Sequence, residues 1–186
     1  MAEPLSDEHH TISQMSEDTT LAGRLGPQDK MHFDAAEGWF ELGNMSESMG
    51  ELDRVEPRSQ THPDVLELRW QIYAKTKNWL LCVDIGKALS KIAPKRASSW
   101  IHWAYSLHEL KRTKEAWDVL FPVASDFPQE TTISYNLACY ACQMGNHDQA
   151  REWLKKAFIA GDEQELRMKI LNDPDLAPLM SDSEPV

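Results

Sequence analysis

Two cysteines, three residues apart, have the spacing in this sequence that most suggests chemistry. Cys139 and Cys142 form a Cys-x-x-Cys pair within the stretch NLACYACQMG. Such a pair can supply half of a tetrahedral zinc site or the two thiols of a redox dithiol. A zinc site needs two further ligands, and a redox dithiol needs surroundings that lower the thiol pKa. The role of the pair therefore depends on the backbone that carries it.

That backbone follows a 34-residue period, which relates Pro94 to Pro128 and Ala116 to Ala150. Repeats that begin at residues 29, 63, 97 and 131 share one phase without insertions. The twentieth position is small in every repeat, which lets two helices approach closely, and Gly-Asn turns follow the first helix in two repeats. The small residues are Ser48, Cys82, Ala116 and Ala150, and the eighth-position residues expected to face them are Ala36, Trp70, Ala104 and Ala138. Each repeat is therefore predicted to be two antiparallel helices.

This pattern resembles the tetratricopeptide repeat, whose signature W-x2-L-G-x2-Y, then A-x3-F, A and P, has the same period. Residues 97–130 match best, and residues 29–62 match least. The residues that carry the best match are Trp100, Trp103, Ala104, Leu107, Ala116, Leu120, Val123 and Pro128. The resemblance implies an all-α fold, a right-handed α-α superhelical solenoid of about four helix pairs with a C-terminal capping helix.

The repeat phase also predicts how the chain is divided. We expect a disordered acidic tail at residues 1–28, which includes His9 and His10 as a solvated pair. We expect a degenerate repeat at 29–62, then repeats at 63–96, 97–130 and 131–164, a capping helix and turn at 165–180, and a tail at 181–186. A further helix is predicted from Glu163 to Leu171. The expected lid over the last repeat consists of Leu166, Ile170, Leu176 and Leu179, because a solenoid end exposes apolar surface.

In this phase Cys139 and Cys142 lie in the middle of a helix, one turn apart. Redox pairs usually lie at a helix N-terminus, where free amides lower the thiol pKa. No second Cys-x-x-Cys supplies the remaining ligands of a zinc site, because Cys82 is two repeats away and His147 lies in the turn beyond the helix. We interpret the two thiols as groove-lining residues and expect no metal and no cofactor, with a thiol-redox or metal-binding protein as the alternative.

The histidines and the tryptophans raise two further questions, whether the histidines serve catalysis and whether the tryptophans form a ligand cage. His102 and His108 could serve catalysis with Glu109 or Cys139 as partner, but no motif fixes that geometry, so we expect solvated groove histidines. The tryptophans could form a ligand cage, but their repeat positions favour core packing for most of Trp39, Trp70, Trp100 and Trp103, and Trp79 falls in a turn. Phosphate loops, G-x-S-x-G elbows and H-E-x-x-H runs are absent from the sequence. We expect no enzyme.

The charge distribution excludes some partners. The net charge is −11, and residues 1–28 hold five acidic residues against one arginine. Without a concentrated basic face, nucleic-acid binding is not expected. The longest apolar runs are far shorter than a membrane span, and the first thirty residues do not resemble a secretory signal. Three cysteines fit reduced thiols, so a cytoplasmic protein is expected.

The resemblance implies a concave groove that binds a peptide or helix of a partner protein, so we expect an adaptor or scaffold whose partner the sequence does not name. A third possibility is that the N-terminal tail or a second copy fills the groove. The Lys, Arg and Asn clamp by which one subset of the family holds a terminal carboxylate is missing except for Asn136. The predicted groove residues are Phe33, Glu37, Gln71, Lys75, His102, Tyr105, His108, Tyr135, Asn136, Cys139, Cys142 and Gln143.

Overall fold

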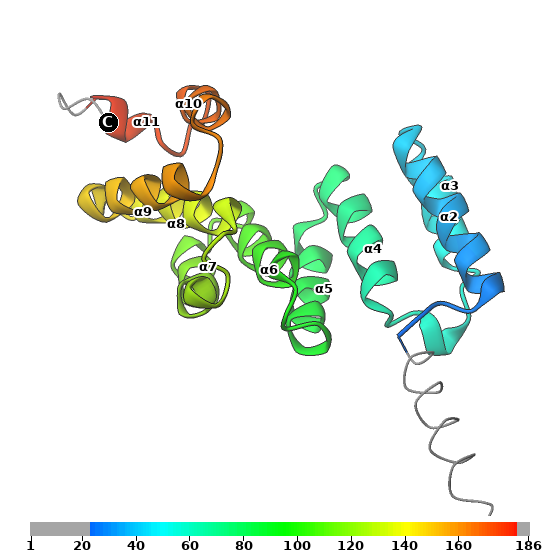
Figure 1. Cartoon of the computed structure of the whole chain (residues 1–186). Helices are drawn as coiled ribbons and strands as arrows, with labels where there is room; N and C mark the ends of the chain where they lie inside the picture. Colours follow the sequence, from blue (N-terminus) through cyan, green and yellow to red (C-terminus); the bar gives the residue numbers. More distant parts are fainter. Residues whose placement is uncertain (1–22, 182–186) are drawn as a thin grey trace, which may run out of the picture. The chain divides into compact units, whose positions relative to one another are not determined.

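The computed structural model describes residues 23–181, with Met180 and Ser181 described by their backbone alone. Most of the predicted tails, including His9 and His10, lies outside the described residues. The chain divides into two compact units, residues 1–65 and 66–186, and each is described by itself. All regular structure in the described residues is helical, and the helices follow one another as antiparallel pairs, as Figure 1 shows.

The first unit is built on one helix pair. It contains α2 (Pro27–Glu41), α3 (Met45–Leu52) and the short 3-10 helix η1 (Pro57–Ser59). The Ser48 hydroxyl donates to the Ala36 carbonyl at 2.7 Å, so the small residue of α3 lies directly against α2. Asp29 is buried and accepts hydrogen bonds from the Glu56 amide at 2.8 Å and the Ser59 hydroxyl at 2.6 Å. These bonds lower the pKa of Asp29 and join η1 to α2.

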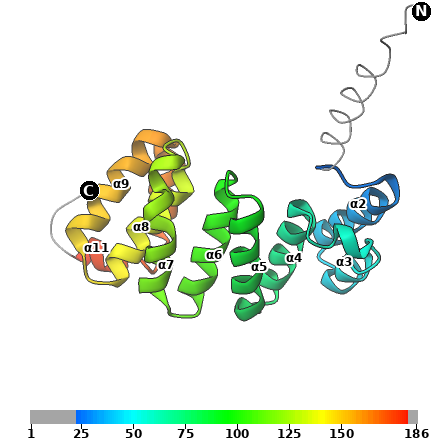
Figure 2. The ribbon, with the colours of Figure 1, turned by 90° about the horizontal axis from the view of Figure 1, so that it is seen from below.

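The second unit, which contains most of α4, also consists of consecutive helix pairs. Its first helices are α4 (Pro63–Lys75), α6 (Ala97–Glu109) and α8 (Thr131–Gln143). Its second helices are α5 (Trp79–Ile92), α7 (Thr113–Leu120), which continues as the 3-10 helix η2 (Phe121–Asp126), and α9 (His147–Ala160). Then come α10 (Glu163–Leu171) and α11 (Ala177–Ser181). Figure 2 shows α5 to α9 side by side in chain order.

The turn inside each pair uses the same backbone conformation. Position fifteen of the repeat has a positive φ in all four pairs: 77° at Gly43, 57° at Lys77, 63° at Lys111 and 79° at Gly145. Glycine adopts this left-handed conformation without cost, whereas a lysine there is strained. The Gly-Asn signal therefore revealed two of the turns, and the other two form in spite of their sequence.

Close packing between the helices depends on the small positions that the repeat phase predicts. Ala116 and Ala150 are fully buried, and the Cys82 thiol lies 3.7 Å from the Trp70 carbonyl, as Ser48 lies against Ala36 in the first unit. A Cβ on Gly86 would lie 2.6 Å from the Trp103 Cα, so α5 and α6 touch through that glycine. These contacts confirm the predicted all-α fold of consecutive helix pairs.

The tryptophans differ in their burial. Trp70 is buried, and Trp100 and Trp103 are half-buried, so these three pack as expected. Trp39 is 38% exposed in the first unit, so it is the exception among the four. Trp79 begins α5 and is half-buried. No helix in residues 23–181 has the length and apolar character that crossing a membrane requires.

Candidate functional site

The predicted groove residues of the second unit come from its three first helices, and we call the surface that they form the first-helix face. It consists of Gln71 and Lys75 on α4, His102, Tyr105 and His108 on α6, and Tyr135, Asn136, Cys139, Cys142 and Gln143 on α8. The other two predicted residues lie on α2 in the first unit, where Phe33 is buried and Glu37 is exposed.

The cysteine pair lies in the middle of α8, as the repeat phase predicts, and both thiols are buried. Burial, followed by the Asp173 carboxylate, raises the pKa of Cys139 far above its ordinary value. A thiol that stays protonated is a poor nucleophile. Within residues 23–181 no three His, Cys, Asp or Glu side chains gather in a geometry that could hold a metal ion. The raised pKa of Cys139 therefore disfavours the thiol-redox alternative.

The C-terminal segment, Asp173–Leu179, lies against the α8 part of this face. The Tyr135 hydroxyl donates to Asp173 Oδ2 at 2.5 Å, and the Cys139 Sγ lies 3.7 Å from the same oxygen. The Gln143 side-chain amide donates to the Asp175 carbonyl at 2.9 Å. Figure 1 shows that the chain reaches this position through α10, which follows α9. Three groove residues of α8 therefore contact the chain's own C-terminal segment.

A fourth contact comes from the neighbouring first helix, α6. His108 Nε2 lies 2.8 Å from Asp175 Oδ2, and its Nδ1 lies 3.0 Å from the Thr113 hydroxyl. A neutral imidazole satisfies both contacts, because Nε2–H donates to the carboxylate while Nδ1 accepts from the hydroxyl. His108 is 5% exposed, so the expectation of a solvated histidine at this position is wrong.

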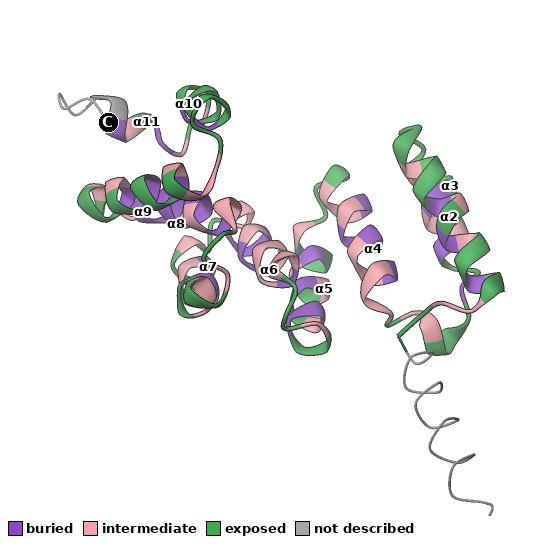
Figure 3. Cartoon of the chain, in the orientation of Figure 1, coloured by how far each residue is buried: buried purple, intermediate pink, exposed green. Residues whose placement is uncertain are grey.

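Burial on α8 differs from that of an open groove. Asn136 is 9% exposed, and the other buried groove residues of α8 are less exposed still: Tyr135, Cys139 and Cys142. Figure 3 shows buried residues along most of α8. The prediction of an accessible surface there is corrected, because the C-terminal segment covers part of it. The sequence indicated that Leu176 and Leu179 form a lid but gave no sign that Asp173 and Asp175 contact groove residues.

The α4 and α6 part of the face is less covered. The Trp70 and His102 rings stack with centroids 3.8 Å apart, and His102 Nε2 lies 3.4 Å from Glu67 Oε1. The hydrogen bond from His102 lowers the pKa of Glu67, with smaller contributions from Ser98 and Arg96. Gln71 lies one turn after Glu67 on the same side of α4 and is half-buried, and Lys75 is exposed. This part presents polar groups around an aromatic stack.

Tyr105 lies between the two parts of the face. Its ring packs edge-on against Trp79 at 5.7 Å and Trp70 at 6.4 Å. Burial and then the Glu109 carboxylate raise the pKa of Tyr105 to about 12, and the carboxylates of Asp175 and Asp173 contribute in the same direction. Tyr105 lies one turn before His108, which contacts Asp175, so the less covered part of the face approaches the C-terminal segment near Tyr105.

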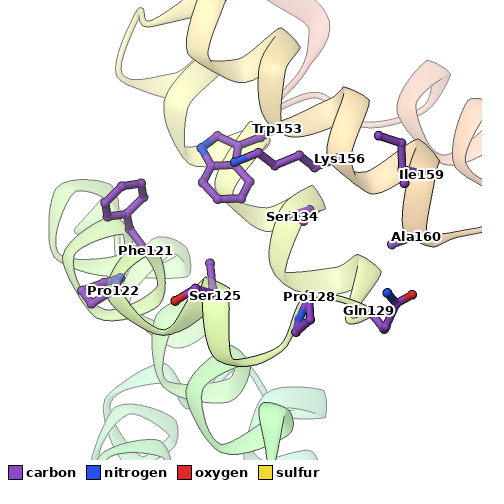
Figure 4. Close-up of a pocket in the computed structure, with 11 residues that line it drawn as sticks. Phe121, Pro122, Ser125, Pro128, Gln129, Ser134, Trp153, Lys156, Ile159 and Ala160 are labelled. Carbon is purple, nitrogen blue, oxygen red and sulfur yellow. The ribbon is translucent and has the colours of Figure 1, made fainter.

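A pocket in this unit lies between η2, the start of α8 and α9, and we call it the second-helix cleft. Its volume is about 560 Å³. Its lining is mostly apolar: Phe121, Pro122, Ala124, Ser125, Pro128, Gln129, Ser134, Trp153, Lys156, Ile159 and Ala160. Figure 4 shows Phe121 and Trp153 at one end of the cleft and Ile159 at the other.

Pro122 accounts for the shape of this cleft. Helices α5 and α9 have 14 residues each, but α7 ends after 8 residues and continues as six residues of 3-10 helix that include Pro122. Proline lacks the amide that an α-helix would use there. Phe121 then stacks on Trp117 at 5.0 Å and lies edge-on to Trp153 at 6.0 Å. The repeat pattern missed this cleft, although a proline inside the expected helix was an available signal.

Solved structures with a similar backbone identify the fold. TTC0263, a thermophilic tetratricopeptide protein of Thermus thermophilus, matches at a TM-score of 0.65 and 17% identity, over 81% of this chain and 80% of that chain. An ArsTM double mutant of MamA RS-1 matches at 0.64 and 15% identity, over 78% of both chains. MamA MSR-1 matches at 0.60 and 19% identity, over 87% of this chain and 91% of that chain.

The sequence itself matches no family model and no curated protein. The structural matches show that the chain has the tetratricopeptide-repeat fold, which confirms the resemblance found in the sequence.

Proposed function

We propose that this chain is a non-enzymatic protein-interaction module that binds a peptide or helix of a partner protein on its first-helix face. One observation carries the proposal: groove residues of α6 and α8 already hold a segment of chain by side-chain hydrogen bonds. Repeat folds of this kind usually present such surfaces to other proteins. We also propose that the four repeats begin at residues 29, 63, 97 and 131.

The part of the face that remains accessible is the best candidate for first contact with a partner. Gln71 can donate and accept hydrogen bonds along a partner backbone, and Lys75 is an exposed cation. Tyr105 offers a half-buried ring close to both Trp70 and Trp79. Rigid aromatic side chains with one polar atom are common anchors at interfaces.

The test compares how tightly a partner protein binds the wild type and a Gln71→Ala/Lys75→Ala variant. The variant changes side chains of the less covered part of the face and leaves the aromatic stack intact. The matched control is Lys87→Ala/Gln149→Ala, which changes two exposed residues on second helices. A partner bound by the wild type should bind the groove variant about tenfold more weakly and the control equally well. Equal binding to all three proteins would contradict the proposal that the partner binds on the first-helix face.

A further inference from the structure

The C-terminal segment indicates which ligand this face accepts. We infer that His108 of α6 and the groove residues of α8 together recognise an acidic turn. The turn has the form Asp-x-Asp-Leu, with a second leucine three residues later. Asp173–Leu179 occupies this site in cis, and a partner segment of the same chemistry displaces it. The inference rests on the proposed function, because it names the class of partner for the same face.

The first aspartate, Asp173, is recognised through both of its carboxylate oxygens. Asp173 Oδ1 accepts from the Asp175 amide at 2.9 Å, which closes a turn within the segment. Asp173 Oδ2 faces two donors from α8, the Tyr135 hydroxyl and the Cys139 thiol. An asparagine could keep the bond from the Asp175 amide, but it would replace the charge-assisted bond from Tyr135 by a neutral one, so the arrangement favours a carboxylate.

The second aspartate, Asp175, is recognised through its carboxylate and through its backbone carbonyl. Its carboxylate accepts from His108, whose ring is oriented by Thr113 and packs at 4.8 Å from Tyr140. Its carbonyl accepts from Gln143, a contact that any residue at this position could make. Two first helices thus contact the same aspartate, α6 through His108 and α8 through Gln143.

Two leucines supply the apolar part of the interaction. Leu176 is fully buried and Leu179 is 1% exposed, and both belong to the continuous core that includes Leu166 and Ile170 of α10. Burying two leucine side chains is favourable, so the segment remains in place while its polar edge is open to water. Asp173 and Asp175 are only half-buried.

Displacement by a partner is feasible because Asp173 and Asp175 are only half-buried and Gln143 is exposed at the edge of the segment. A segment tethered through α10 has an effective concentration in the millimolar range, so a short peptide of the same sequence competes poorly. A partner segment that continued past Tyr105 to Gln71 would make contacts that the cis segment lacks. The additional contacts would give such a partner the advantage over the resident segment.

The test uses the full chain and a fluorescent peptide with the sequence of residues 171–181. Asp173→Asn/Asp175→Asn weakens the cis segment and leaves every receptor side chain unchanged. We expect the peptide to bind this variant at least about tenfold more tightly than it binds the wild type, because the cis competitor has lost two charge-assisted hydrogen bonds. Fluorescence anisotropy gives both dissociation constants.

Two controls accompany this measurement. A peptide with asparagine in place of both aspartates should bind neither protein, and an Asp118→Asn variant should behave as wild type, because its carboxylate pairs with Lys114 on the exposed side of α7. A second loosening variant, Pro174→Gly, keeps all the contacts and raises the chain entropy of the released segment. It should give roughly two- to fivefold tighter peptide binding, even if the double variant fails to fold.

The inference is overturned if folded variants bind the peptide no better than wild type, or if the asparagine peptide binds as well. The segment is then a permanent cap. That result leaves the proposed function intact, provided that Gln71→Ala/Lys75→Ala still loses its partner. Loss of both effects would reject the function as well.

Discussion

The two sides of the last helix pair differ in what covers them. On the α8 side, Tyr135 and Cys139 face the Asp173 carboxylate of the chain's own C-terminal segment. On the α9 side, the second-helix cleft is open, and Phe121 and Ile159 at its rim are 47% and 87% exposed. The covered side has polar, directional contacts, and the open side has mainly apolar surface.

This difference shows how the same repeat supports two kinds of surface. Hydrogen-bonding side chains on first helices select a ligand by its chemistry, and here they select an acidic turn. An apolar hollow made by a helix break offers contact area but little selectivity. We therefore place recognition on the first-helix face, and each of the following experiments tests the contrast between the two sides.

Removing a buried leucine of the C-terminal segment should have the largest effect. Leu176→Ala should lower the free energy of unfolding by about 3 kcal/mol, because it deletes a fully buried side chain. Leu171→Ala is the matched control, since Leu171 is 69% exposed, and should change stability by less than about 0.5 kcal/mol. Urea unfolding followed by circular dichroism measures both. Equal effects would mean that the segment does not pack as described.

Alkaline pH should have the next largest effect, because it ionises buried thiols and hydroxyls of the second unit. Burial raises the pKa of Cys82 to about 11 and raises the pKa values of Cys139 and Tyr135 above their ordinary values. A raised pKa in the folded state gives stability that is full below the unfolded value, 9.0 for cysteine and 10.0 for tyrosine, and that is lost as pH rises toward the folded value. We expect the free energy of unfolding to fall by about 1–2 kcal/mol between pH 8 and pH 11.

This pH dependence has an internal control. In Tyr135→Phe the loss above pH 10 should be shallower, because one group with a raised pKa is gone. Stability that stays constant up to pH 11 would contradict the described burial of these thiols and hydroxyls.

Neighbouring residues on α8 allow a direct comparison of the two sides at pH 7. Tyr135→Phe removes the hydroxyl that donates to Asp173 and should cost about 1 kcal/mol. Ser134→Ala changes the adjacent residue, which lines the second-helix cleft, and should cost less than about 0.5 kcal/mol. Thermal unfolding of both variants checks the ranking. A larger cost at Ser134 would reverse the contrast.

The smallest effect is expected at the rim of the cleft. Ile159→Ser replaces a side chain that is 87% exposed, so stability should stay within about 0.5 kcal/mol of wild type. Binding of the 171–181 peptide should be unchanged, since Ile159 lies on the cleft side. A loss of peptide binding in this variant would place recognition in the second-helix cleft instead.

Periodicity made most of the fold predictable. The small residues Ser48 and Cys82 each bond to a carbonyl of the preceding helix, as the phase requires, and the cysteine pair lies mid-helix as expected. Lys77 and Lys111 show the limit of the turn signal, because both end a first helix with capping hydrogen bonds in a left-handed conformation that lysine does not favour. Local patterns recur every 34 residues, so one sequence contains several independent signals for the same element.

The site was less predictable because it depends on contacts between distant residues. Tyr135 and Asp173 are 38 residues apart, and His108 and Asp175 are 67 apart. No repeat pattern relates such pairs, since the C-terminal segment lies outside the period. The repeat phase predicted which positions face the groove, but it could not predict that residues 173–179 contact them.

Native-state amide hydrogen exchange tests the central claim most directly. The Leu176 and Leu179 amides donate to Asp173 and Leu176 carbonyls within the segment, so they report its release, and the Cys139 amide reports opening of α8. The account predicts exchange at Leu176 and Leu179 at least about a hundredfold faster than at Cys139, and faster still with excess 171–181 peptide. Exchange of all three amides at one rate, unaffected by the peptide, would contradict it.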